Sequence, residues 1–271
     1  MKYAIFNYKV VVEPLAIPFS DRALQFGDGL FETIAVKGGN VLYLNQHINR
    51  LKKGGKILNI SLDHKFLQQL PDLIAQLTAK NDLTQANVKL IIWRRTKENR
   101  GYGYEGNETN YLLSCKPWVQ KQAIIQQAAF ASTVNLHHSP LSAIKTLNAL
   151  PYILAANERS QRDVDELILL NTDGYVSECV AANIFWKNNN TYYTPSLESG
   201  CLDGVMRNVI IEKFQKNRLN IEAILARPEE LLKADAIFTT NSLGMQKIGK
   251  INSTTFSTTL KYEQLLQSLW S

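Results

Sequence analysis

The pattern that decides the fold lies in residues 31–43, which read FETIAVKGGNVLY. The first six residues are rich in strand formers, and the Gly-Gly-Asn sequence at 38–40 is a turn signal before a second short apolar run. Together they predict a β-hairpin. Apolar residues at helical spacing follow at once and predict an amphipathic helix over 44–53.

The pattern continues on both sides of a long polar segment. Apolar spacing predicts a second helix over 65–80, and residues 88–93 and 111–115 are typical of strands. They flank the glycine-bearing stretch 96–110, so we expect a hairpin with a long loop, a kind of loop that is often functional. The best boundary between two domains is Lys116-Pro117-Trp118. We therefore expect a smaller N-terminal domain over 1–116 and a larger one over 117–271.

The second half shows the same mixture of elements. Helices are expected over 147–161, after Gly204 and after Pro228, and turn signals separate the short strands. No series of alternating strands and helices appears, so the predicted class is α+β. The expected strands are 124–130, 167–170, 175–178, 183–186 and 191–194.

Composition excludes several classes of protein. The 271 residues are 45% hydrophobic and carry a net charge of +6, but no dense Lys/Arg run indicates nucleic acid binding. The three cysteines have no spacing typical of a metal site or disulfide framework. No apolar run approaches membrane-spanning length and no signal peptide is evident. We expect a cytoplasmic protein with no membrane, metal or nucleic acid partner.

Four separate segments could carry chemistry, and each also has an ordinary structural explanation. They are residues 21–33, 144–148, 176–186 and 200–207. The first, DRALQFGDGLFET, could be no more than a tight glycine loop before a strand. Lys145, in the second, could be a surface lysine with a buried stem, or a desolvated amine with a lowered pKa that forms a Schiff base.

The other two segments leave the same choice open. Glu178 lies in a small-residue, strand-like stretch, where a carboxylate needs a partner. That partner could be a structural cation or the nitrogen of a pyridine ring, which the carboxylate would keep protonated. Gly204 opens a helix, which is either a plain turn or an anion site made of backbone N–H groups.

Together and in this order, from about residue 18 to 250, the four segments resemble the fold type IV, or class IV aminotransferase-like, pyridoxal-phosphate enzymes. The group includes branched-chain and D-amino-acid aminotransferases and 4-amino-4-deoxychorismate lyases. The resemblance implies a two-domain α+β architecture of the D-amino-acid aminotransferase type and pyridoxal 5'-phosphate as cofactor. It also implies a homodimer, with Lys145 as the Schiff-base lysine in the C-terminal domain.

The resemblance assigns roles to further residues. Lys145 matches the catalytic lysine that binds the cofactor and moves protons, and Glu178 matches the partner of the pyridine nitrogen. Arg50, on one flank of its helix with His47, matches the arginine of the cofactor phosphate. The remaining cofactor-binding positions implied are Val205 and Met206 at a helix start and Asn241 and Ser242 in a phosphate-side loop.

Within the family the sequence is most similar to the aminodeoxychorismate lyases, on residues 20–29, 100–102, 179–186 and 240–243. Thr33 and Leu150 stand where branched-chain aminotransferases usually have glycine and tyrosine, although residues 145–148 also fit D-amino-acid aminotransferases. The stretch 245–250 lacks the Pro-Val ending common in the group. The lyase is the leading hypothesis and an aminotransferase for D- or branched-chain amino acids is the alternative.

The substrate pocket is the less defined part of the site. A small-molecule carboxylate substrate is expected, with Arg100 on the long loop as its candidate ligand, although a solvated loop arginine explains that residue equally well. Thr33 and Tyr102 are further candidates. From another class altogether, the chain could be a catalytically silent scaffold that binds the cofactor or another anion.

Overall fold

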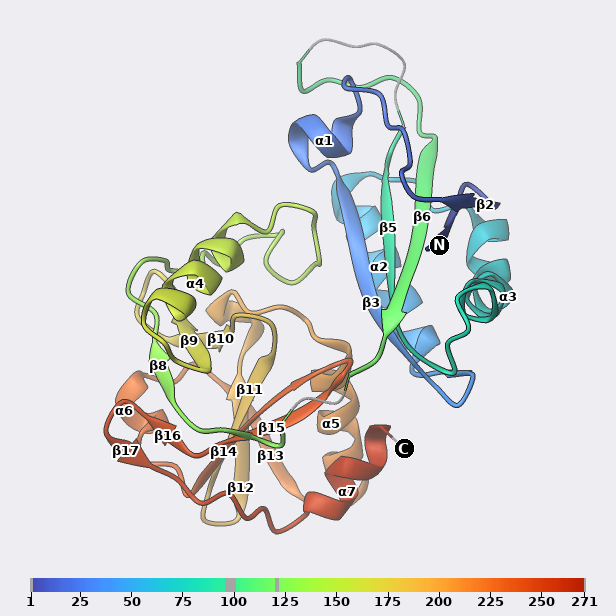
Figure 1. The fold of residues 1–271 in the computed structure, drawn as a ribbon. Helices are drawn as coiled ribbons and strands as arrows, with labels where there is room; N and C mark the ends of the chain where they lie inside the picture. Colours follow the sequence, from blue (N-terminus) through green and yellow to red (C-terminus); the bar gives the residue numbers. More distant parts are fainter. Residues whose placement is uncertain (1, 96–100, 120–121, 271) are drawn as a thin grey trace. The chain divides into compact units, whose positions relative to one another are not determined.

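The computed structural model describes residues 2–95, 101–119 and 122–270 (Figure 1). Contacts within the chain define two compact units. Unit 1 contains Met1–Val119 together with Ile144–Asn148, and unit 2 contains Gln120–Ala143 and Ala149–Ser271. The mixture of helices with largely antiparallel sheets confirms the predicted α+β class. None of the helices in the described ranges is both long and apolar enough to cross a membrane.

Unit 1 is an antiparallel sheet in the order β2-β1-β6-β5-β3-β4, with two helices that share its core. Helix α3 starts at Asp63, whose side chain caps the backbone N–H of Lys65, and buries Phe66, Leu70 and Ile74. The predicted hairpins are both present. The elements are β1 (Tyr3–Phe6), β2 (Lys9–Val12), α1 (Arg22–Phe26), β3 (Gly29–Lys37), β4 (Asn40–Val41), α2 (Leu44–Leu58), α3 (His64–Lys80), β5 (Gln85–Arg94) and β6 (Thr109–Pro117).

Unit 2 contains two sheets, in the orders β10-β9-β8-β16-β17 and β13-β12-β11-β14-β15-β7. Its core is an apolar cluster that includes Trp186, Ile237 and Ile248. The elements are β7 (Ile124–Ile125), β8 (Ala128–Phe130), α4 (Leu150–Gln161), β9 (Glu166–Leu170), β10 (Val176–Cys179), β11 (Asn183–Asn188), β12 (Thr191–Pro195), η1 (Leu197–Ser199), α5 (Val205–Lys216), β13 (Asn220–Ile224), α6 (Pro228–Leu231), β14 (Ala236–Asn241), β15 (Gly244–Ile248), β16 (Lys250–Ile251), β17 (Thr254–Thr255), α7 (Glu263–Gln267) and η2 (Ser268–Trp270).

Three details of the secondary structure differ from expectation. The run 124–130 is two strands in different sheets, because β7 pairs with β15 and β8 pairs with β9. Two strand–helix–strand crossovers occur, since β8 and β9 are parallel on either side of α4, and β12 and β13 are parallel on either side of α5. Helix α4 begins at Leu150 rather than near 147, because the preceding residues pair with β3.

The boundary between the units differs in one respect from the predicted domains. Unit 1 runs to Val119, close to the expected end at 116, but it also includes the segment that carries Lys145. The sequence interpretation placed this lysine in the C-terminal domain. The difference arises because Ile144 is 5% exposed and belongs to the core cluster of unit 1. The division into domains over 1–116 and 117–271 stays a prediction.

Candidate functional site

Lys145 lies on an extended segment that continues the sheet of unit 1. The N–H of Phe31 donates to the carbonyl of Lys145 at 2.9 Å, and the N–H of Leu147 donates to the carbonyl of Gly29 at 3.0 Å. A Cβ at Gly29 would lie 2.5 Å from the carbonyl oxygen of Ile92 and 2.8 Å from the Leu147 side chain. Because only glycine permits this approach, the GDG sequence positions the backbone of Lys145.

The half-buried side chain of Lys145 lies against an aromatic ring, with Nζ 4.4 Å from the centroid of Phe31. Successive side chains of a strand alternate between faces, so Phe31 and Thr33 point to the same side of β3. Lys89 is opposite Thr33 in register, and its Nζ lies 4.8 Å from the Phe31 ring. Lys145, Phe31 and Thr33 therefore lie together with a second amine, that of Lys89. The sequence alone does not show that Lys89 belongs to this group, because its position depends on the strand register.

Arg50 belongs to a buried charge cluster that the sequence analysis did not recognise. Its Nε and Nη2 donate to the two carboxylate oxygens of Glu32 at 2.8 and 2.5 Å, and His47 Nδ1 lies 2.7 Å from Glu32 Oε2. Burial alone would raise the pKa of Glu32, but Arg50 and His47 outweigh it and lower the pKa to about 2. The fork of two hydrogen bonds holds the guanidinium in one orientation.

The remaining substrate candidates lie on the long loop. Tyr102 is 85% exposed, and its ring is tilted against Phe26 with centroids 5.5 Å apart. Its side chain therefore does not line a closed pocket in unit 1. Arg100 lies outside the described residues.

Glu178 is the centre of the polar cluster of unit 2, and only 3% of its surface is exposed. Its Oε1 accepts the hydroxyl of Tyr152 at 2.6 Å and the N–H of Leu202 at 3.2 Å, and its Oε2 accepts Asn183 Nδ2 at 3.4 Å. Burial and the neighbouring Glu178 raise the pKa of Tyr152, which keeps the phenol protonated as a donor. Three donors thus hold this carboxylate in position.

The start of helix α5 lies beside the same cluster. Its N-cap Gly204 makes no side-chain hydrogen bond, and Val205 and Met206 form its buried first turn. A Cβ at Gly204 would overlap the side-chain oxygen of Asn183, and Asn183 pairs with Thr240 across strands β11 and β14. Glycine at this position therefore brings the helix N-terminus close to both strands.

Thr240 lies in the predicted phosphate-side segment 238–242, although only Asn241 and Ser242 were predicted there as cofactor-binding residues. Its hydroxyl is buried and makes no hydrogen bond to any part of the chain that the structure describes. Both ends of the neighbouring Asn241 amide are hydrogen bonded: Nδ2 donates to the carbonyl of Ala181, between β10 and β11, and Oδ1 accepts the N–H of Leu243 in its own turn. Ser242 follows in that turn and is half-buried.

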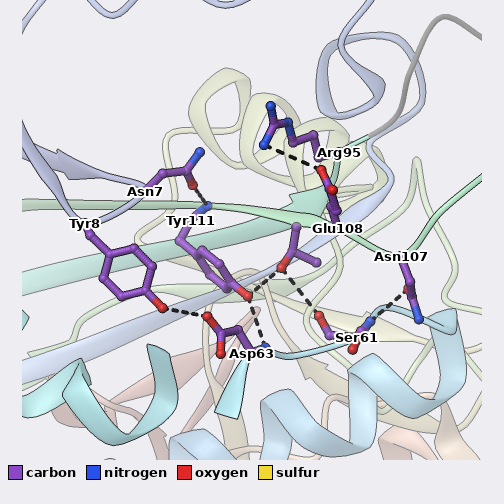
Figure 2. A pocket seen from close by; sticks show the side chains of 9 residues that line it. Asn7, Tyr8, Ser61, Asp63, Arg95, Asn107, Glu108 and Tyr111 are labelled. Atoms are coloured by element: carbon purple, nitrogen blue, oxygen red, sulfur yellow. Dashed lines mark hydrogen bonds and ion pairs between the residues drawn. The ribbon is translucent and has the colours of Figure 1, made fainter. Parts of the chain in front are cut away.

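A separate cavity of about 380 Å³ in unit 1 contains none of the predicted site residues (Figure 2). Much of its polar lining is hydrogen bonded within the lining itself: Tyr8 donates to Asp63 at 2.6 Å, and the N–H of Ser61 donates to Asn107 at 3.2 Å. The cavity therefore forms the base of the long loop rather than a second site. It is lined by Asn7, Tyr8, Ser61, Asp63, Arg95, Asn107, Glu108, Thr109 and Tyr111.

Comparison with known proteins places this arrangement in a family. A family profile described as amino-transferase class IV matches residues 29–251. The chain is 26% identical over 241 residues to a D-alanine aminotransferase of Listeria monocytogenes, covering 88% of this chain and 83% of that one. It is 28% identical over 250 residues to an aminodeoxychorismate lyase of Bacillus subtilis, covering 90% and 83%.

Structural comparison gives the same result. The crystal structure of 4-amino-4-deoxychorismate lyase from Pseudomonas aeruginosa superposes with a TM-score of 0.86 at 27% identity, covering 98% of this chain and 97% of that one. The chain belongs to the class IV aminotransferase family, whose members are pyridoxal-phosphate-dependent enzymes. The expected fold type and cofactor are thereby confirmed.

The side chains described in unit 2 fit this cofactor chemically. An uncapped helix N-terminus beside a buried hydroxyl with no partner in the described chain is what a phosphate dianion requires. A buried carboxylate held by three donors suits a protonated ring nitrogen. The donor set therefore agrees with the family assignment.

Proposed function

We propose that the protein is a pyridoxal-phosphate-dependent lyase that converts 4-amino-4-deoxychorismate to 4-aminobenzoate and pyruvate, a step toward folate. The observation that carries the proposal is the likeness to the Pseudomonas aeruginosa lyase, which covers nearly the full length of both chains at 27% identity. The lyase-like residues 20–29 support it, because they include the glycine that positions the Lys145 backbone.

Each part of the cofactor has a proposed set of ligands. Lys145 binds it covalently, and Glu178 keeps the ring nitrogen protonated. Arg50 and the backbone of Val205 and Met206 hold the phosphate, and we add the Thr240 hydroxyl to this set. Asn241 and Ser242 contribute by shaping the turn behind Thr240, since the Asn241 amide is already hydrogen bonded to Ala181 and to Leu243.

The reaction needs one proton transfer and one bond cleavage. When bound, the cofactor supplies an electron sink conjugated to the substrate amine. The amine of Lys145 removes the proton from the ring carbon that bears the amine, acting as general base. The electron pair released leads to loss of the enolpyruvyl oxygen substituent and formation of the aromatic ring. Enolpyruvate then takes up a proton to give pyruvate, so no oxidant or second keto acid is required.

The substrate carboxylates need cationic or polar partners. We propose Arg100 for one of them, with Thr33 and Tyr102 as further pocket residues. The position of Thr33 on the Lys145 side of β3 supports its part in this set. Replacement of Thr33 by Gly is expected to alter KM for the substrate without releasing the cofactor, which can be measured by steady-state kinetics and absorbance.

The alternative is an aminotransferase for D- or branched-chain amino acids. It is favoured by the 26% identity to the Listeria D-alanine aminotransferase over 88% of this chain. It would use the same lysine and the same ring carboxylate, but it would leave the amine on the cofactor after the first half-reaction. That difference is directly observable.

The decisive experiment is an assay of the purified protein with aminodeoxychorismate beside a panel of D- and branched-chain amino acids. The lyase releases 4-aminobenzoate, and Lys145→Ala abolishes its formation. Conversion of the protein's absorbance to the pyridoxamine form by an amino acid, with no 4-aminobenzoate produced, would replace the lyase by the aminotransferase. Full activity in Lys145→Ala would contradict both.

We also propose a cytoplasmic homodimer, on the family resemblance. Sedimentation equilibrium of the cofactor-loaded protein tests the oligomeric state, since a monomer at micromolar concentration would contradict it. Fractionation of the source cells tests the location, and recovery in a membrane or secreted fraction would contradict that part.

A further inference from the structure

The described end of the long loop is attached to the protein by one buried arginine. Arg22 is 6% exposed, and its guanidinium donates to three consecutive backbone carbonyls. Nη1 reaches Gly101 at 3.3 Å and Gly103 at 3.0 Å, and Nη2 reaches Tyr102 at 3.0 Å. A guanidinium has fixed donor directions, so this set of bonds specifies one conformation of residues 101–103.

A single carboxylate connects this arginine to a second one. Asp28 Oδ2 accepts Arg22 Nε at 2.7 Å and Arg94 Nε at 2.9 Å. Arg94 is 2% exposed and stacks on Tyr104 with Cζ 3.5 Å from the ring centroid. Both sides of the loop end are thus fixed by guanidinium groups that share one anion.

Asp28, which carries this carboxylate, stands between two glycines whose carbonyls bind the segment that contains Lys145. Its neighbour Gly27 accepts Asn148 Nδ2 at 3.1 Å, and its other neighbour Gly29 accepts the N–H of Leu147 at 3.0 Å. Asp28 therefore links the loop end to the segment 145–148 through a chain of direct contacts within unit 1. At the other end of the loop, Asn107 binds the backbone of Ser61 (Figure 2).

We propose that Arg22 is a positioning residue that sets the substrate-binding conformation of loop 101–104. This rests on the proposed function only in taking that loop as part of the substrate pocket. Burying two guanidinium groups around one carboxylate is costly unless the remaining donors are satisfied. The remaining donors of Arg22 are satisfied by backbone carbonyls of the loop, and those of Arg94 by the carbonyls of Leu58 and Asn59. The loop conformation and the Arg22 side of the charge cluster therefore stabilise each other.

The test replaces Arg22 by Lys, which keeps the charge but has no fork to reach three carbonyls. The substrate KM is expected to rise about tenfold, which corresponds to about 1.4 kcal/mol of lost binding, while kcat changes less than about twofold. Cofactor affinity stays at the wild-type value. Arg95→Lys is the matched control, because Arg95 is an exposed arginine near the same loop, and it leaves KM unchanged.

A second measurement separates positioning from general destabilisation. Amide hydrogen exchange of residues 101–104 is expected to accelerate in Arg22→Lys, with the exchange of β3 and α3 unchanged. Tyr104→Leu, which removes the stacking partner of Arg94, is expected to raise KM in the same direction. In the double variant Arg22→Lys/Tyr102→Ala, the two effects on KM are less than multiplicative, because both act through one loop.

Each outcome has a defined meaning. An unchanged KM and unchanged loop exchange in Arg22→Lys would overturn the proposal, and so would loss of the cofactor with KM unaltered. The exchange measurement needs no substrate. If the wild type lacks lyase activity while loop exchange still accelerates in the variant, the proposed reaction fails but the positioning role stands, and KM is then measured for the amino acid that reacts.

Discussion

Two buried carboxylates show how single residues are held in this protein. In unit 1, Glu32 pairs with Arg50 and His47. In unit 2, Glu158 is 4% exposed and accepts the N–H and hydroxyl groups of Ser132 and Thr133, together with Arg162 at 2.7 Å. Neither carboxylate is a reacting group in the proposed chemistry. Their effect is to fix the orientation of the groups around them.

Replacing Glu32 by Gln tests its role toward Arg50. The change leaves the Arg50 guanidinium buried without its anion, a situation that typically costs about 3–5 kcal/mol. We expect a loss of folding stability of this order and a weaker affinity for pyridoxal phosphate, because Arg50 loses its fixed orientation. Urea unfolding and a cofactor titration measure the two effects. Wild-type affinity in a folded Glu32→Gln protein would show that Arg50 does not need this carboxylate.

Glu158 makes the free energy of unfolding decrease as the pH falls into the acid range. Burial alone would raise its pKa, but the bonds from Thr133, Arg162 and Ser132 prevail and lower it from 4.5 to about 2. A lowered folded-state pKa gives stability that is present above the unfolded value and lost as the pH falls through the folded value. The stabilisation is therefore complete near neutral pH and declines from about pH 5 towards about pH 2.

The corresponding variant is Glu158→Gln. It should lose about 1–3 kcal/mol of unfolding free energy at neutral pH, because the buried donors around it lose their charged acceptor, and show a flatter dependence between about pH 5 and about pH 3. Chemical denaturation across this range measures both. Glu222→Gln on the exposed edge strand β13 is the control and should follow the wild type. An equal slope for Glu158→Gln and wild type would contradict the assignment.

At the scale of elements, the phosphate ligands proposed in unit 2 come from helix α5 and strand β14, which both lie next to Asn183 of strand β11. Helix α5 approaches β11 because Gly204 has no Cβ to overlap Asn183, and β14 brings Thr240 opposite the same asparagine. The resulting group of polar atoms depends on three elements separated by tens of residues. Its geometry follows from strand register and one glycine.

Replacing Thr240 by Val should stabilise the fold of the cofactor-free protein but weaken its binding of the cofactor. Without cofactor, removal of a buried hydroxyl that has no partner in the described chain should stabilise the protein by about 1 kcal/mol. With cofactor, loss of one hydrogen bond to a charged group should weaken binding by about 1.5–3 kcal/mol. Thermal unfolding and cofactor titration measure these. Thr239→Val, on the opposite face of β14, should leave cofactor affinity unchanged.

A structural feature could be predicted from the sequence where neighbouring residues determine it, and could not be predicted where residues far apart in the chain determine it. Helix α3 was predicted correctly because its apolar residues recur along one face. The motif segments around Lys145 and Glu178 were found by resemblance. The pairing of Glu32 with Arg50 and the burial of the Thr240 hydroxyl depend on tertiary register and left no local signal. The run 124–130 was misjudged because two buried strands in different sheets follow one another without a turn residue.

At the scale of the whole molecule, unit 1 is completed by a segment from far along the chain. Ile144–Asn148 contributes a core side chain at Ile144 and backbone hydrogen bonds to the edge of β3. The remainder of the unit ends at Val119. Residues 1–119 alone would therefore lack part of their core and leave one strand edge unpaired.

A fragment of residues 1–119 should fold less stably than the same fragment joined to residues 144–148 by a flexible linker. Burying one isoleucine side chain contributes about 1.5–3 kcal/mol, and pairing the edge adds to it. Urea unfolding and dye binding to exposed apolar surface compare the two. A linked fragment with the order of the five residues scrambled is the control. Equal stability of all three fragments would show that the segment is not part of the unit's fold.

The late arrival of Ile144–Asn148 also has a consequence for protein synthesis. Once Val119 has been made, the ribosome must still translate Gln120–Ala143 before the segment that completes the sheet exists. At about 5–20 residues per second this takes on the order of one to five seconds. Throughout that interval the nascent chain exposes an unpaired strand edge beside an incomplete apolar core. We expect chaperones to bind the nascent chain mainly in this period. Slower translation of Gln120–Ala143 would lengthen the period and raise the risk of aggregation.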